Sequence, residues 1–64
     1  MMTLEPHKMY RIAYNADDAH LRGKLVVFLE YVDRPSFDVR RARVALISDD
    51  GGIYYVKPSL LIAN

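Results

Sequence analysis

The sequence predicts an all-β fold in which five short strands form one small barrel. The first observation behind this prediction is that glycine and proline are few and that the segments between them are rich in β-branched and aromatic residues. The second is that 52% of the 64 residues are hydrophobic while the formal net charge is only +1, a composition typical of a folded domain rather than a disordered chain. A single domain is therefore expected over residues 1–64, with residues 1–7 as a flexible N-terminal arm.

The first strand is expected over residues 8–14. Tyr10, Ile12 and Tyr14 alternate there with a second set of side chains, at the period of two that is typical of a strand. Residues 15–22 are polar and too few for a stable helix. They are expected to form a polar loop after the first strand, with at most one helical turn.

A long central strand is expected over residues 23–32, because nearly every residue after Gly23 is β-branched, aromatic or leucine. Pro35 ends this segment. Residues 39–47 (VRRARVALI) leave two interpretations open, since arginine, alanine and leucine favour a helix as well as fitting a strand.

A β-hairpin is expected to join residues 39–47 to a strand at residues 53–56. Its loop, residues 48–52, contains Asp-Asp-Gly-Gly, and aspartate and glycine tolerate the backbone angles that hairpin loops require. Pro58 follows in a tight turn, where its missing N–H breaks no ladder hydrogen bond. Residues 60–62 then form a short last strand.

Three short motifs resemble a known fold family. Residues 52–62 (GIYYVKPSLLI) look like the last two strands of an SH3 domain, although Lys57 is inserted before the Pro-Ser pair. Residues 9–14 (MYRIAY) are similar to the aromatic first strand of that family, and Gly23 before a hydrophobic strand resembles the KOW motif of SH3-like ribosomal and transcription proteins. The resemblance implies an SH3-like barrel, a fold found in accessory subunits of larger assemblies and in phage-encoded proteins. It implies no particular activity.

The predicted strands carry apolar residues on both faces, whereas a half-buried antiparallel strand has one polar face. One interpretation is that a strongly bent central strand buries each face in turn. The other is that one face is an exposed patch for another protein or a second copy of this chain. This second interpretation predicts a docking surface made of Leu25, Val27, Leu29, Tyr31, Ile47 and Tyr55.

Nucleic-acid binding by a KOW-like barrel is the alternative function. Its candidate phosphate-binding residues are Arg40, Arg41, Arg43, Lys24 and Lys57, and its candidate base-stacking residues are Tyr10, Tyr14, Tyr54 and Tyr55. Two observations weigh against it. The chain has nine basic and eight acidic residues, which is nearly balanced, and strand alternation separates Arg40 from Arg41 and Arg43. In the docking interpretation, Arg41 and Arg43 would instead orient a protein partner at the rim of the surface.

Other functions have less support in the sequence. The only histidines are His7 and His20, and no serine lies near either one to form a nucleophilic pair, so neither an enzyme nor a cofactor is expected. Residues 17–20 (Asp-Asp-Ala-His) could ligate a metal ion, but a solvated loop is expected, with no metal. A proline-peptide groove lined by Tyr10, Tyr14 and Tyr55 would lack the usual tryptophan.

No membrane span is expected, because the longest apolar run is residues 25–29, against roughly 20 residues for a spanning helix. The first eight residues carry acid, proline and histidine where a secretory signal has an apolar core. A cytoplasmic location is therefore expected.

Overall fold

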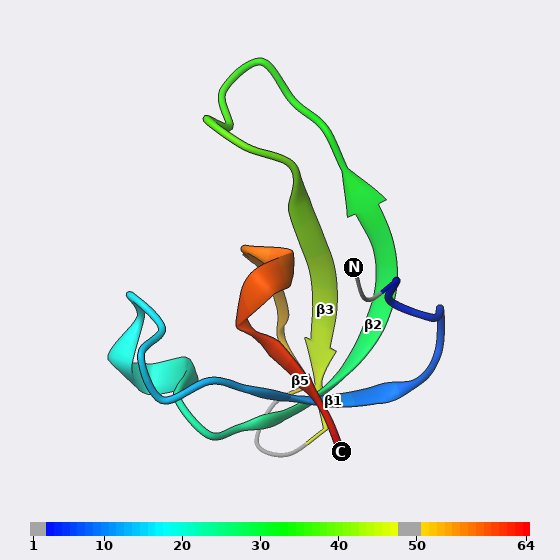
Figure 1. The fold of residues 1–64 in the computed structure, drawn as a ribbon, viewed down its shortest axis with the longest axis vertical. Coiled ribbons are helices and arrows are strands. Elements are labelled where there is room, and N and C mark those ends of the chain that lie inside the picture. Colours follow the sequence, from blue (N-terminus) through cyan, green and yellow to red (C-terminus); the bar gives the residue numbers. More distant parts are fainter. Residues whose placement is uncertain (1–2, 48–50) are drawn as a thin grey trace.

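The computed structural model describes residues 3–47 and 51–64 and contains one antiparallel sheet (Figure 1). Its strands are β1 (Met9–Ile12), β2 (Leu25–Val32), β3 (Arg41–Leu46), β4 (Ile53–Val56) and β5 (Leu61–Ala63). Two 3-10 turns, η1 (Ala19–Leu21) and η2 (Pro58–Leu60), complete the regular structure. The all-β class and the five strands are confirmed, and the third strand is a strand rather than a helix.

The strand order is β4-β3-β2-β1-β5, with β4 and β5 at the two edges. Within the described residues the sheet is not closed, since no ladder joins these edges. β2 is the central strand: its first half pairs with β1, and β3 follows it along its length. In Figure 1, β2 and β3 rise together along the long axis, and the loop that joins them projects beyond the rest of the molecule.

A β-bulge at Leu29 decides which side chains of β2 face the core. Phe28 lies opposite Val44, but the next pair is Glu30 with Arg43, so Leu29 has no partner in β3. Beyond the bulge the alternation is reversed, because one extra residue moves every later side chain to the other face. The prediction that Tyr31 shares a face with Leu25 is therefore wrong. Tyr31 packs on the core, with its ring 5.0 Å from that of Phe28.

The core lies on one face of the sheet, which we call the inner face. Its largest fully buried side chains are Phe28, Ile12, Val26 and Val44. Alternate residues of β3 complete it from the centre of the sheet, and the loop after β1 contributes Ala16 and Leu21. The polar loop predicted after the first strand is thus present and covers part of the core.

The N-terminal segment also belongs to the core. Leu4 is only 5% exposed, and its backbone N–H donates to the Tyr31 hydroxyl at 3.1 Å. The N–H of Glu5 donates to the Tyr10 hydroxyl at 2.9 Å, and the N–H of His7 donates to a β2 carbonyl at 2.7 Å. The contacts of Leu4, Glu5 and His7 with the sheet differ from the expectation of a flexible arm. Residues 1 and 2 of that arm lie outside the described part of the chain.

Two glycines occupy backbone conformations that other residues rarely adopt. Gly23 has φ +73° at the turn into β2, and a Cβ there would lie 2.7 Å from the ring of Tyr14. Gly51 has φ +68° in the β3–β4 hairpin, which the N–H of Leu46 closes by donating to the carbonyl of Gly52 at 2.9 Å. The predicted loop itself lies mostly at residues 48–50, outside the described residues. Left-handed backbone explains both glycines without a ligand.

Candidate functional site

The face of the sheet opposite the core, here called the outer face, carries an apolar row across four strands. Met9 lies opposite Val27, Val27 opposite Ala45, and Ala45 opposite Ile53. Side chains directly opposite one another in an antiparallel pair are in contact range. The row is therefore continuous from β1 to β4, with no charged side chain in it.

Neighbouring positions widen this row into a patch. Leu25 is the next residue of β2 on the same face as Val27, and the backbone N–H of Ile47 donates to the Leu25 carbonyl at 3.1 Å. Tyr55 flanks the row on β4, and Ile62 lies on the same face of β5, separated from Leu25 by Arg11. We call this set the outer-face patch; its members are Met9, Leu25, Val27, Ala45, Ile47, Ile53, Tyr55 and Ile62.

The patch holds most of the exposed large hydrophobic side chains in the described residues. Met9, Ile47, Ile53 and Ile62 are each between 44% and 50% exposed, and only Tyr14 and Val39 of this kind lie elsewhere. Scattered exposed hydrophobics are normal, whereas these side chains gather on one face of the sheet.

The predicted docking residues divide three ways. Leu25, Val27, Ile47 and Tyr55 are brought together in the patch, Leu29 is the half-buried bulge residue, and Tyr31 faces the core. Met9, Ile53 and Ile62 were missed. Alternation within residues 53–56 already placed Ile53 on the same face as Tyr55, and alternation within the first strand separated Met9 from the tyrosine beside it. Only the register between strands shows that Met9 and Ile62 share the face of Val27.

An arginine–aromatic cluster lies where the patch meets the β2–β3 loop. The guanidinium of Arg34 lies 4.9 Å from the centre of the Tyr55 ring and donates to the Tyr55 hydroxyl at 3.2 Å. Phe37 packs beside that ring at 5.8 Å, and Arg41 lies 5.8 Å over Phe37. Contacts of this kind hold flexible arginine side chains in place.

The residues predicted for phosphate binding are mostly paired with carboxylates. Arg40 pairs with Asp33 at 3.2 Å, Arg41 with Asp38 at 3.1 Å and Arg43 with Glu30 at 3.0 Å. Lys57 follows β4 at the rim of a pocket. Lys24 precedes β2, at one end of the β2–β3 ladder, and Arg41 lies at the other end. The structure thus does not gather the five basic residues into one patch.

The tyrosines predicted to stack bases or line a peptide groove are also dispersed. Tyr10 is 3% exposed in the core, so it can do neither. Tyr14 is 72% exposed and lies over Gly23. Tyr54 packs against the core from the inner face of β4, and Tyr55 lies on the outer face.

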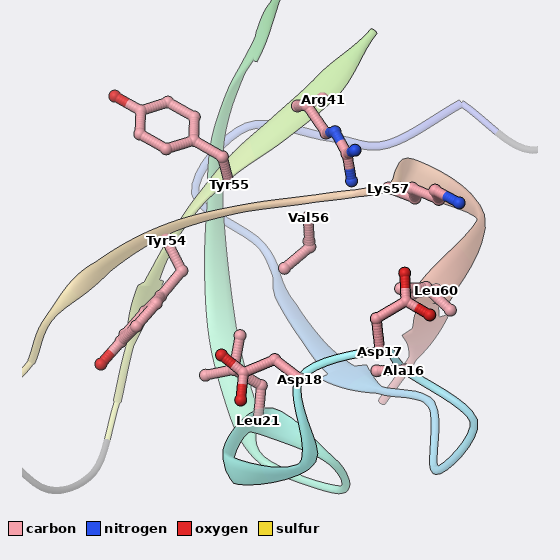
Figure 2. Close-up of a pocket in the computed structure, with 10 residues that line it drawn as sticks. All are labelled: Ala16, Asp17, Asp18, Leu21, Arg41, Tyr54, Tyr55, Val56, Lys57 and Leu60. Atoms are coloured by element: carbon pink, nitrogen blue, oxygen red, sulfur yellow. The ribbon is translucent and has the colours of Figure 1, made fainter. Parts of the chain in front are cut away.

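A pocket of about 130 Å³ lies between the loop after β1, β4 and η2 (Figure 2). Its residues are Ala16, Asp17, Asp18, Leu21, Arg41, Tyr54, Tyr55, Val56, Lys57 and Leu60. Figure 2 shows Val56 at the centre, the two aspartates along one side and the two basic residues along the other. The pocket therefore combines apolar and oppositely charged groups.

The acidic segment at residues 17–20 is organised as a helix cap. The Asp18 carboxylate accepts a hydrogen bond from the N–H of His20 at 3.0 Å, which begins η1. Across residues 3–47 and 51–64, no three acidic, histidine or cysteine side chains stand close enough to hold a metal ion. No helix in that part of the chain has the length and apolarity to cross a membrane.

No protein-family model, curated protein or solved structure matches the chain. Its geometry defines a small all-β protein of one antiparallel sheet, with an apolar patch on its outer face and a charged pocket beside β4.

Proposed function

We propose that this protein is a non-enzymatic interaction module with an SH3-like fold, and that it docks on another protein through the outer-face patch. The observation that carries the proposal is the continuous apolar row from Met9 to Ile53 across four strands. The strand order, the polar loop after β1 and the Pro-Ser turn before β5 support the SH3-like assignment.

Docking would use a large share of the surface of so small a molecule. A standard interface takes about 800 Å² from each partner, which is about a fifth of the 4344 Å² that the molecule exposes. Interfaces of this kind have an apolar, aromatic centre and a polar rim. The outer face has this composition, with Val27 near its middle and Tyr55 and Arg34 at one margin.

The charges within and beside the patch indicate an acidic partner. Arg43 is neutralised by Glu30, but Arg11 and Arg34 have no carboxylate partner among the described residues. Arg11 lies in the pair row between Leu25 and Ile62 and donates to the Gly23 carbonyl at 2.8 Å, and Arg34 is held on Tyr55. The partner surface that fits is apolar at its centre with carboxylates at its rim.

The test compares Val27→Glu, in the middle of the patch, with Val39→Glu, at a 48% exposed valine outside it. Tagged wild type and both variants capture partners from the native cell extract, and each partner is then purified and titrated. A charge buried without a counter-ion costs about 3 kcal/mol or more, so Val27→Glu should weaken the complex at least about 100-fold while Val39→Glu leaves it unchanged.

Circular dichroism and the thermal midpoint check that both variants remain folded. The proposal is wrong if every captured protein binds Val27→Glu as tightly as wild type. Light scattering tests the other occupant: self-association that Val27→Glu abolishes would replace the acidic partner by a second copy of this chain.

Nucleic-acid binding is the second candidate, favoured by the arginines and aromatic rings gathered at the β2–β3 loop. It has less support, because Arg40, Arg41 and Arg43 each pair with a carboxylate and Arg34 already covers the ring of Tyr55. Binding that weakens steeply with salt would favour it over protein docking.

A further inference from the structure

The pocket beside β4 has walls that the fold holds in place. Its loop wall is fixed by Arg22, whose Nε donates to the Ala16 carbonyl at 2.6 Å, and by the Asp18 cap of η1. The wall formed by η2 is joined to the first loop, since the N–H of Ala13 donates to the Leu60 carbonyl at 2.8 Å. A ligand therefore meets a preformed site and spends little of its binding energy on ordering it.

The surface inside these walls is apolar. Val56 is buried and projects toward the centre of the pocket, and Leu21 and Leu60 line it as well, below and to the right of Val56 in Figure 2. Tyr54 adds the flank of its ring. The volume of about 130 Å³ is well below the roughly 300 Å³ at which drug-sized ligands are bound, so the pocket admits only a small molecule.

The charges at the rim are opposite in sign and are not joined to one another. Among the described residues, neither the Asp17 carboxylate nor the Lys57 ammonium has an ion-pair or hydrogen-bond partner, although both line the pocket. Arg41 and Asp18 also line the pocket, but Arg41 pairs with Asp38 and Asp18 caps η1. A ligand with one charge can meet only Asp17 or Lys57, whereas a zwitterion meets both at once.

We propose that this pocket binds a free α-amino acid with a short aliphatic side chain. The ligand carboxylate lies toward Lys57, its ammonium lies toward Asp17, and its side chain packs on Val56. This site is separate from the proposed docking surface, with which it shares only Tyr55 at one margin.

The test is a titration of isotope-labelled protein with L-valine, followed by the chemical shifts of the backbone amides. Saturable shifts are expected at residues 16–21 and 54–60. Isovalerate lacks the ammonium group, isobutylamine lacks the carboxylate and glycine lacks the aliphatic group. Each should bind at least about tenfold more weakly than valine, because each loses one charge-assisted contact or the apolar one.

Matched variants separate the site from general charge effects. Lys57→Met and Asp17→Asn should each weaken valine binding about tenfold. The controls Lys8→Met and Asp33→Asn remove the same charges at positions outside the pocket and should leave binding unchanged.

The proposal is overturned if valine produces no saturable shifts, if isovalerate binds as tightly as valine, or if both pocket variants bind like wild type. The ligand series on the wild-type protein decides the matter even if a variant fails to fold. Because the shifts expected here lie away from Val27, loss of this site and loss of the docking surface are distinguishable.

Discussion

Truncation of Leu4 should destabilise the protein far more than its place near the N-terminus suggests. The side chain is 5% exposed and packs in the core. Leu→Ala changes at buried sites cost about 2–5 kcal/mol, and a segment near a chain end can partly relax into the space, which favours the lower part of that range. We therefore expect Leu4→Ala to cost about 2–3 kcal/mol.

That loss is large for a chain of this size. At about 0.05–0.15 kcal/mol per residue, the 64 residues have an unfolding free energy of roughly 3–10 kcal/mol. The thermal midpoint should fall by about 10–20 °C, since 1 kcal/mol corresponds to about 4–8 °C in a small domain.

Urea and thermal unfolding followed by circular dichroism measure the effect. Val39→Ala is the control, because Val39 is 48% exposed in the β2–β3 loop and should change the unfolding free energy by less than about 0.5 kcal/mol. If Leu4→Ala and Val39→Ala agree within about 0.5 kcal/mol, the N-terminal segment does not belong to the core and the reasoning is refuted.

Two further predictions concern single polar groups. Tyr31→Phe removes the hydroxyl that accepts a hydrogen bond from a partly buried backbone N–H, and it should cost about 1 kcal/mol of unfolding free energy in urea. Tyr55→Phe removes a hydroxyl whose hydrogen bond is exposed, and it should cost almost nothing. Equal effects would contradict the different environments of the two rings. Glu5 accepts a hydrogen bond from Lys8 and attracts its charge, which raises the pKa of Lys8 above its ordinary value of 10.5. The stabilisation that comes from the raised pKa of Lys8 is therefore fully present below pH 10.5 and is lost as the pH rises through the raised pKa. Lys8→Met should leave the pH dependence of unfolding unchanged between about pH 6 and 9. A change within that range would contradict the assignment.

Local sequence patterns predicted most of the secondary structure. The fourth strand was predicted at residues 53–56 and lies at Ile53–Val56, because β-branched and aromatic residues between a glycine turn and a proline have few other structures available. The loop after β1 and the turn at Pro58 followed from the same kind of signal. Residues 39–47 stayed ambiguous, since their propensities are similar for helix and strand, and pairing with β2 decided between them.

The sequence by itself determined that the strands carry more apolar side chains than one face can bury, because that is a matter of composition and alternation. Which of those side chains remain exposed was decided by the tertiary structure. Register aligned Met9 and Ile53 with Val27, and the bulge at Leu29 turned Tyr31 into the core. The pocket was likewise beyond prediction, because its walls come from the loop after β1, from β3 and from the β4–η2 segment, which only the packing of the sheet brings together.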